Sequence, residues 1–407
     1  MKLNIQIFGL GFVGLTTALA LSKMKFRVHG VENDNSKLES LKKKKLYFYE
    51  PHLKDRLKIE MKKKYFSFSN NYFISKKEVN IFFICVGTPD KKNGSANISE
   101  IENIIQLISK NSKECKVIFV IKSTVPPGTS EYLRKKYSFK NLSFVSNPEF
   151  LREGYAWKDF FNSGRIVIGH IKDFEKKVMK KIYKKFSDPI IFTSNNTAEF
   201  IKYLSNTLLA NLISFSNEMT IFAEKFGNIN IKDSFTAAKL DKRWNGYPCN
   251  MASYLHPGIG YGGYCLPKDV KALIHLMQKF KKNNLLKEIN TVNNEVFYYQ
   301  LNKILKNENK KIFFLGLSFK PGSDDIRNSI SIKLLKYLEL NKEKKIFACD
   351  YLCYQKVRKI FSKKVTILKQ PKIMKNTTYV MCTAHKKYIT FLKKINKKQI
   401  LDLRYLT

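Results

Sequence analysis

A glycine-rich turn between an apolar strand and an apolar helix is the feature that most constrains this chain. Residues 3–8 predict a strand, residues 15–23 predict a helix, and the turn GLGFVG at residues 9–14 separates them. Residues 27–31 predict a second strand. A strand, a tight turn, a helix and a further strand form one unit of a parallel sheet, so the chain is predicted to open with a doubly wound α/β domain.

The three glycines of this turn have separate tasks in a dinucleotide site. Gly9 permits the tight turn, Gly11 lets the backbone approach a pyrophosphate, and Gly14 lets the helix pack closely on the strand. Glu32 stands 18 residues after Gly14, where a carboxylate accepts hydrogen bonds from both ribose hydroxyls and repels a 2′-phosphate. These residues predict NAD rather than NADP, although a glycine turn of this kind also occurs without a ligand.

Further strands complete the first domain and bring polar residues to its edge. They are predicted at residues 81–86, 117–122 and 142–145. The first two run into the motifs VGTP and KSTVPPGT, and ligands of doubly wound sheets bind at the carboxyl ends of strands. Thr88 and Thr124 are therefore predicted to face the cofactor, while ordinary turn chemistry explains them equally well.

A long helix and a second α/β domain follow. Residues 197–226 have apolar side chains at helical spacing and end at Gly227, so they predict one helix of about 45 Å that can tie two domains or two subunits together. The strand–glycine–helix pattern returns at residue 311. More strands are predicted at residues 346–349, 365–368, 378–382 and 400–403. The predicted domains are residues 1–196, 197–300 and 301–407, and a chain of 407 residues has room for all three.

Charge and hydropathy narrow the class of partner. The chain has 75 Lys and Arg against 33 Asp and Glu, and its net charge of +42 is of the kind that favours nucleic acid or an anionic membrane. Nine of these cations are Arg, the usual reader of phosphates and bases, and the lysines are dispersed along the whole chain. No apolar stretch approaches the length of a membrane span, and no leader precedes the first strand. The sequence therefore predicts a cytoplasmic protein that binds neither nucleic acid nor a membrane.

One of the seven cysteines stands in an unusual setting. The seven are odd in number and form no CxxC pair, so neither disulfides nor a metal site is expected. Cys265 ends a stretch with four glycines in six residues and precedes Lys268 and Asp269. A nearby cation stabilises the nucleophilic thiolate, so Cys265 is predicted to be a catalytic nucleophile. The alternative is a small, buried apolar residue.

Seven motifs, in their order along the chain, resemble those of the UDP-glucose/GDP-mannose dehydrogenase family. They are GLGFVG, VGTP, STVPPGT, NPEFLREG, EFIKYLSN, GYGGYCLPKD and GLSFKPGSDDIRNS. The resemblance runs from residue 1 to about residue 400, and through YGGYCLPKD it is greatest to bacterial UDP-glucose 6-dehydrogenases. It implies two Rossmann-like domains joined by a long central helix that forms a dimer interface, which agrees with the three-part pattern above.

The resemblance implies an NAD-dependent, four-electron oxidation of a sugar C6 alcohol to a carboxylate, through an aldehyde and a cysteine thioester. Cys265 would form the thioester. Lys202 would stabilise the oxyanion, and Asn206 lies one helical turn later on the same face. Asp269 would orient or activate water, and Glu149 would be the base for thioester hydrolysis. Without the resemblance, Lys202 is read as a solvated helix lysine.

The resemblance also assigns ligand contacts. Thr124 is implied to hold a catalytic water. The implied cofactor contacts are Gly9, Gly11, Val13, Gly14, Glu32, Lys37, Thr88, Thr124, Glu153, Lys268 and Arg327. The implied contacts to the nucleotide sugar are Glu149, Phe150, Leu151, Arg152, Glu153, Lys202, Asn206, Arg243, Tyr254, Leu255, His256, Pro257, Gly258, Gly262 and Lys320.

Three departures from the family pattern limit what carries over. Glu32 stands where the family usually has Asp. Cys249 aligns with an arginine that reaches the sugar nucleotide of the neighbouring subunit; the nearest arginine, Arg243, lies 22 residues before Cys265 instead of 16, which indicates about six inserted residues. His385 replaces an acidic or aromatic residue, and no role follows from that. The insertion affects the prediction of the substrate more than that of the reaction.

The sequence favours UDP-glucose as the substrate and UDP-glucuronate for surface polysaccharide as the product. The first alternative is the same reaction on GDP-mannose, a UDP-N-acetyl-hexosamine or UDP-galactose. The second is a basic NAD-binding protein with a vestigial active site, which acts at nucleic acid or a membrane surface; the intact set of Cys265, Lys202, Asn206 and Asp269 argues against it. The expected partners are a nucleotide sugar and a second copy of the chain.

Overall fold

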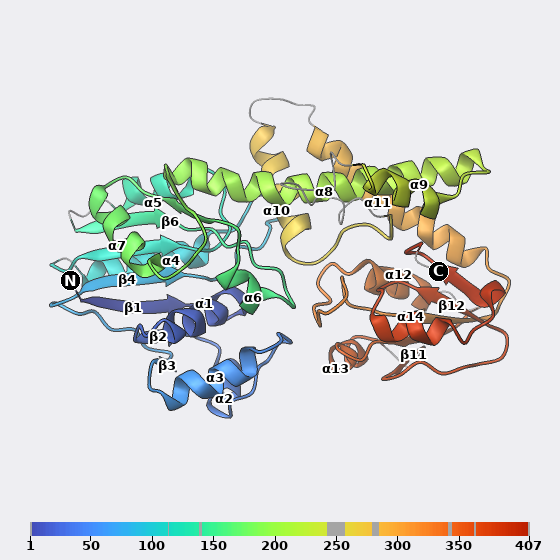
Figure 1. The fold of residues 1–407 in the computed structure, drawn as a ribbon, viewed down its shortest axis with the longest axis horizontal. Helices are drawn as coiled ribbons and strands as arrows, with labels where there is room; N and C mark the ends of the chain where they lie inside the picture. The colour runs from blue at the N-terminus through green and yellow to red at the C-terminus, as the bar shows by residue number, and fades with distance from the viewer. Residues whose placement is uncertain are drawn as a thin grey trace. The chain divides into compact units, whose positions relative to one another are not determined.

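The computed structural model of the chain divides into two compact units, Met1–Ser205 and Asn206–Thr407. The structure describes residues 2–112, 114–137, 141–241, 257–278, 285–340, 344–361 and 364–405. Each unit contains a doubly wound α/β sheet, and a long helix, α8, runs from the first unit into the second (Figure 1). The predicted fold class, two Rossmann-like domains joined by a long helix, is confirmed.

The first unit is built on an eight-stranded sheet in the order β3-β2-β1-β4-β5-β6-β7-β8. Its strands are parallel except for β6 and β7, which pair antiparallel at Ser146 and Gly169. The register places Ile7 of β1 beside Gly30 of β2 and Phe83 of β4. The strands are β1 (Leu3–Phe8), β2 (Val28–Val31), β3 (Phe66–Ser69), β4 (Val79–Ile84), β5 (Val117–Ile121), β6 (Leu142–Ser146), β7 (Ile166–Gly169) and β8 (Ile190–Thr193).

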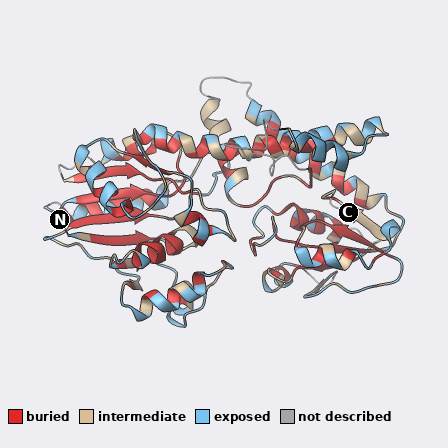
Figure 2. Cartoon of the chain, in the orientation of Figure 1, coloured by how far each residue is buried: buried red, intermediate tan, exposed pale blue. Residues whose placement is uncertain are grey.

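Helices cover both faces of this sheet. They are α1 (Phe12–Lys23), α2 (Asn35–Lys42), α3 (Leu53–Lys62), α4 (Ser99–Asn111), α5 (Thr129–Lys136), α6 (Ala156–Phe161) and α7 (Asp173–Tyr183). Alternate strand residues face opposite sides, so Phe83 packs with α1, α3, α6 and α7, whereas Phe82 packs with α4 and α5. A parallel sheet that is covered on both faces needs apolar side chains at nearly every position, as the buried central strands show (Figure 2).

The long helix α8 (Asn195–Phe226) has 32 residues and agrees with the prediction for residues 197–226. It ends at Gly227, whose φ of +83° is readily adopted by glycine and whose N–H donates to the carbonyl of Ala223 at 3.1 Å. Among the described residues, no helix combines the length and the apolar character that crossing a membrane requires.

The second unit has a five-stranded parallel sheet in the order β11-β10-β9-β12-β13. Its strands are β9 (Lys311–Leu315), β10 (Lys345–Cys349), β11 (Val365–Leu368), β12 (Thr377–Met381) and β13 (Ile400–Asp402). Its further helices are α9 (Ile231–Lys239), α10 (Cys265–Met277), α11 (Leu285–Leu305), α12 (Ile330–Glu339), α13 (Tyr354–Arg358), α14 (Lys386–Leu392) and the 3-10 turn η2 (Lys397–Gln399). Phe314 packs toward α11 and α12, and Phe313 packs toward α14, so this sheet is also covered on both faces.

Candidate active site

The turn between β1 and α1 has the geometry of an anion site. Gly9 has φ +81°, and a Cβ on Gly14 would lie 1.8 Å from the carbonyl oxygen of Gly9, so a side chain at either position is strained or excluded. Gly11 precedes α1 without a side-chain cap, and a Cβ built there meets nothing within 4 Å. The first N–H groups of α1 therefore have no side-chain cap from Gly11, and a pyrophosphate has room to approach the backbone at this residue.

The carboxylate of Glu32, directly after β2, lies beside this turn. Its Oε2 accepts from the backbone N–H of Leu10 at 2.9 Å, and its Oε1 accepts from the N–H of Asp34 at 3.1 Å. The Nζ of Lys37 is 3.7 Å from Oε2. Each carboxylate oxygen has two lone pairs, so both oxygens keep capacity for a ribose hydroxyl. The turn and Glu32 together fit the adenosine half of NAD.

The two predicted threonines lie next to each other after neighbouring strands. Thr88 follows β4 and Thr124 follows β5, and the hydroxyl of Thr88 donates to the backbone carbonyl of Thr124 at 2.8 Å. Both residues are buried. Val13 lies on α1, and Lys37 lies on α2.

The loop after β6 carries the predicted base, and α8 supplies its cation. The Nζ of Lys202 lies 3.0 Å from Oε1 of Glu149 and 5.3 Å from the centre of the Phe150 ring, and both charged side chains are buried. Oε2 of Glu149 accepts from the N–H of Leu151 at 2.5 Å. Arg152 is held by Asp159 through two side-chain hydrogen bonds. Lys202 is therefore a buried, ion-paired lysine rather than a solvated one.

A second buried lysine, Lys122, lies beneath this loop and was missed by the sequence analysis. It is 5% exposed, and its Nζ is 3.3 Å from Oδ1 and 3.5 Å from the carbonyl oxygen of Asn147. Burial lowers the pKa of Lys122 to about 8. Lys122, Glu149 and Arg165 are among the residues that line a cavity of about 30 Å³, which has room for a water molecule. The one available signal was a lysine at the end of an otherwise apolar strand.

The predicted nucleophile, Cys265, is the first residue of α10 and is exposed, whereas the other five cysteines in the described ranges are buried or half-buried. A buried apolar role is therefore excluded. The dipole at a helix N-terminus favours the thiolate. Four residues further on, Asp269 is fully buried, with Nζ of Lys268 at 2.5 Å from Oδ1 and Nδ2 of Asn206 donating to Oδ2 at 2.5 Å.

The glycine loop before Cys265 packs against the loop after β9. A Cβ on Gly262 would lie 2.5 Å from the carbonyl oxygen of Asn328, and the N–H of Gly258 donates to the side chain of Asn217 at 2.7 Å. A Cβ on Gly258 would lie 2.7 Å from the guanidinium of Arg404, a half-buried arginine near the C-terminus that was not selected from the sequence. The local sequence DLRYL carries no pattern that would have identified it.

The remaining predicted residues of the second unit lie in the loop between β9 and α12. Gly316 has φ +85°, and a Cβ there would lie 2.4 Å from the carbonyl oxygen of Thr383. Lys320 and Arg327 follow in this loop. The guanidinium of Arg327 pairs with Asp325, Nη2 to Oδ2 at 2.6 Å, and lies 4.4 Å from the ring centre of Tyr264, the residue before Cys265.

The predicted site residues are divided between the two units. Thr124, Glu149 and Lys202 belong to the first unit, and Asn206, Cys265 and Asp269 belong to the second. In the loop after β6, Glu153 is half-buried. Pro257 is buried in the second unit. Four predicted substrate contacts lie outside the described residues: Arg243, Tyr254, Leu255 and His256.

Comparison with known proteins covers nearly the whole chain. Residues 3–187 match the NAD binding domain of the UDP-glucose/GDP-mannose dehydrogenase family, residues 196–295 match its central domain, and residues 313–407 match its UDP binding domain.

Two curated relatives are similar over most of their length. A putative UDP-glucose 6-dehydrogenase of Bacillus subtilis is 37% identical over 348 residues, which cover 83% of this chain and 79% of that protein. The UDP-glucose 6-dehydrogenase of Rickettsia prowazekii is 35% identical over 373 residues, which cover 88% of this chain and 83% of that protein.

Two solved structures have the same fold. A UDP-glucose dehydrogenase from the hyperthermophilic archaeon Pyrobaculum islandicum superposes with a TM-score of 0.88 at 29% identity, over 100% of this chain and 95% of that one. A UDP-D-ManNAc dehydrogenase from Pyrococcus horikoshii superposes with a TM-score of 0.80 at 22% identity, over 100% and 96% of the two chains.

Proposed function

Because this chain belongs to the UDP-glucose/GDP-mannose dehydrogenase family and is an NAD-dependent nucleotide-sugar dehydrogenase, we propose that it oxidises UDP-glucose to UDP-glucuronate. Two relatives at 35% and 37% identity bear the name UDP-glucose 6-dehydrogenase, in one case as a putative assignment, and they support this donor. The structure similar at 29% identity, titled a UDP-glucose dehydrogenase, supports it too.

The accessible thiol of Cys265 carries the proposal. Its Sγ adds to the carbon of the sugar aldehyde and forms a thiohemiacetal; oxidation of that adduct leaves a thioester, and water then releases the carboxylate and returns the thiol. When bound, NAD would accept the hydride in both oxidations, first that of the C6 alcohol to the aldehyde and then that of the thiohemiacetal to the thioester, one molecule for each. The position of Cys265 at the start of α10 favours the thiolate that the addition requires.

The buried charged groups have complementary tasks in this proposal. Lys202 donates to the oxyanion that develops on the sugar, and Glu149 accepts a proton from the hydrolytic water. Nζ of Lys202 and Oε1 of Glu149 lie 3.0 Å apart in a buried ion pair, so each side chain holds the other in place. Asp269 is held by Lys268 and Asn206, so its carboxylate is oriented before substrate binds.

A donor panel tests the proposal. Purified protein is supplied with NAD and, separately, with UDP-glucose, GDP-mannose, a UDP-N-acetyl-hexosamine and UDP-galactose. UDP-glucose should give two NADH per sugar and the other donors almost none. A different donor with the highest kcat/KM would transfer the proposal to that sugar, and the absence of turnover with every donor would favour the vestigial protein.

We also propose that the chain forms a homodimer through α8. Seven large apolar side chains on this helix are between 39% and 73% exposed, and they are spaced three, four or seven positions apart, which places them on one face. They are Phe200, Leu204, Leu208, Phe215, Met219, Phe222 and Phe226. Leu208→Glu should convert a dimer into a monomer in light scattering after gel filtration, and a monomeric native protein would contradict the proposal.

We also propose a division into three domains and a cytoplasmic location. The division into residues 1–196, 197–300 and 301–407 is supported by the three family matches, which begin and end near these boundaries. A cytoplasmic location is supported by the six free cysteines of the described residues.

A further inference from the structure

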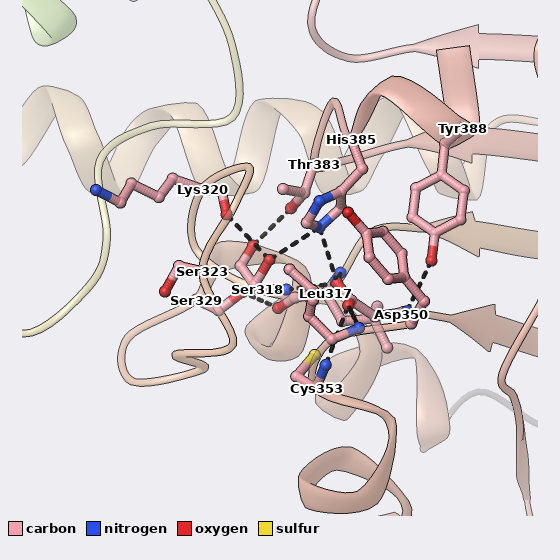
Figure 3. A network of polar contacts seen from close by, with 12 residues as sticks. Leu317, Ser318, Lys320, Ser323, Ser329, Asp350, Cys353, Thr383, His385 and Tyr388 are labelled. Atoms are coloured by element: carbon pink, nitrogen blue, oxygen red, sulfur yellow. Dashed lines mark hydrogen bonds and ion pairs between the residues drawn. The ribbon is translucent and has the colours of Figure 1, made fainter. Parts of the chain in front are cut away.

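Three strand ends of the second unit meet at one buried polar network. The loop after β9 contains Ser318 and Lys320, Asp350 follows β10, and His385 follows β12 (Figure 3). Lys320 is the lysine that the family resemblance assigns to the nucleotide sugar. What holds this loop therefore bears on how the donor binds.

Asp350 anchors the loop through its backbone. Oδ2 of Asp350 accepts from the N–H groups of Leu317 at 2.8 Å and Ser318 at 3.2 Å. Oδ1 accepts from the N–H groups of Leu352 at 2.9 Å and Cys353 at 3.2 Å. The side chain is fully buried. The carboxylate is thus occupied by the fold itself.

His385 connects this carboxylate to the loop. Its Nε2 lies 3.2 Å from Oδ2 of Asp350 and 3.1 Å from Oγ of Ser318, and the residue is 2% exposed. The rings of Tyr351 and Tyr388 pack against the imidazole, with centres at 5.0 and 5.5 Å. The side chain is therefore fixed by packing as well as by polar contacts.

The partners of Ser318 determine where the imidazole proton lies. The hydroxyl of Ser318 has one proton, and it donates this proton to the backbone carbonyl of Lys320 at 3.1 Å, a group that can only accept. Oγ of Ser318 must then accept from His385, and the carboxylate of Asp350 also accepts. Both contacts require a proton on Nε2, so one chain of donors runs from His385 through Ser318 to Lys320.

We propose that His385 is a positioning residue for binding of the nucleotide sugar. It holds the loop of residues 316–322, and with it Lys320, in the binding position before the donor arrives. The inference rests on the proposed function only in assigning the sugar nucleotide to this loop. A preorganised loop loses less conformational entropy on binding, so removal of His385 should weaken binding more than it slows the chemical steps.

The test uses the full-length protein and titrates UDP by calorimetry beside steady-state kinetics. His385→Leu should raise the Kd for UDP and the KM for the sugar nucleotide about tenfold, with kcat within about twofold and NAD binding unchanged. His385→Gln should recover most of the affinity, because its amide can donate to both Asp350 and Ser318. Ser318→Ala should fall between the two.

Thr378→Val is the matched control. Thr378 lies at the opposite end of β12, where its hydroxyl accepts from Asn309 at 2.9 Å and donates to Asn307 at 2.6 Å. This change should lower the Tm but leave the Kd for UDP unchanged. If His385→Leu does not fold, the comparison of His385→Gln and Ser318→Ala with Thr378→Val decides.

Three results would overturn the inference: a native Kd for UDP in the folded His385→Leu and Ser318→Ala variants, equal losses in the Thr378→Val control, or a glutamine variant no better than leucine. Failure of the proposed function looks different. In that case the native protein turns over no donor, while the UDP titrations still report on His385.

Discussion

The glycine turns of the two units share their backbone and differ in the use of the acid beside them. Gly9 and Gly316 have φ of +81° and +85°, and their N–H groups donate to the last residues of β2 and β10 at 2.9 and 3.0 Å. An acid follows each of these strands. Glu32 accepts from two backbone N–H groups, whereas Asp350 accepts from four and from His385.

The difference indicates a division of labour between two copies of one motif. Glu32 keeps hydrogen-bonding capacity for a ribose, so its unit can select a cofactor through this carboxylate. The oxygens of Asp350 are engaged within the protein, so the second unit must recognise its ligand through other groups. We therefore expect the same position in the motif to bind the cofactor in one unit and to support the fold in the other.

The largest expected effect is a loss of catalysis that leaves the affinity for both ligands unchanged. Cys265→Ser leaves both turns intact and removes the thiol, so acid production should fall at least about a thousandfold, because the hydroxyl is a far weaker nucleophile. NAD and UDP should bind with native affinity in calorimetry. Steady formation of the acid at the native rate would remove Cys265 as the nucleophile.

Asp350→Asn should show that Asp350 stabilises the fold. An amide nitrogen in place of one carboxylate oxygen would face backbone N–H groups and leave them without an acceptor, which should cost about 3 kcal/mol of the free energy of unfolding. Urea denaturation measures the loss, with Glu32→Gln as the matched variant of the other unit. We expect the Glu32→Gln variant to lose less than about 1 kcal/mol, since Glu32 holds fewer backbone groups. Equal losses would contradict the comparison.

Protonation of Asp350 at low pH should lower the stability of the protein. Burial alone would raise the pKa of Asp350, but the hydrogen bond and charge of His385, with the N–H groups of Leu317 and Leu352, lower it to about 2. The native state then binds its proton less readily than the unfolded state, so this group contributes stability above about pH 4 and loses it as the pH falls toward 2.

The free energy of unfolding measured from pH 5 to pH 2 should therefore fall by about 2 kcal/mol more in the native protein than in Asp350→Asn. Two parallel pH curves would show that this carboxylate is not perturbed.

The smallest expected effect concerns Glu32, the acid that we expect to bind the ribose. Glu32→Ala should weaken NAD binding about tenfold, because it removes the predicted acceptor of the ribose hydroxyls. The Kd for UDP should be unchanged in the same calorimetric series. An equal loss of both ligands would show that Glu32 supports the fold, as Asp350 does, and would remove the distinction between the two turns.

Local pattern predicted the elements on which these turns stand. The prediction for residues 3–8 matches β1, and the helix expected at 197–226 is α8, because buried parallel strands and long helices carry strong apolar periodicity. The strand expected at 81–86 ends at Ile84, since Cys85 and Val86 are apolar residues of the following turn. The edge strands β3 and β8 are four residues long and mostly half-buried or exposed, so they carry little pattern and were not predicted.

Candidate site residues could be predicted from the sequence where a motif marks the start or end of a helix or strand. Cys265 was selected from its glycine loop, and the structure places it at the start of α10. The His385–Ser318 contact joins positions 67 residues apart, and neither residue lies in a pattern that reports its partner. Lys122 was overlooked for the same reason, because its importance comes from burial and neighbours that only the folded chain reveals.

The unbroken helix α8 fixes the distance and the angle between the residues that it carries. Lys202 and Asn206 are both buried and are separated by one turn of an unbroken 32-residue helix. Inserting a single amino acid between them would swing one side chain about 100° around the axis and push it about 1.5 Å farther along. We therefore expect related sequences to vary in the length of their surface loops but to contain no insertion or deletion between these two positions.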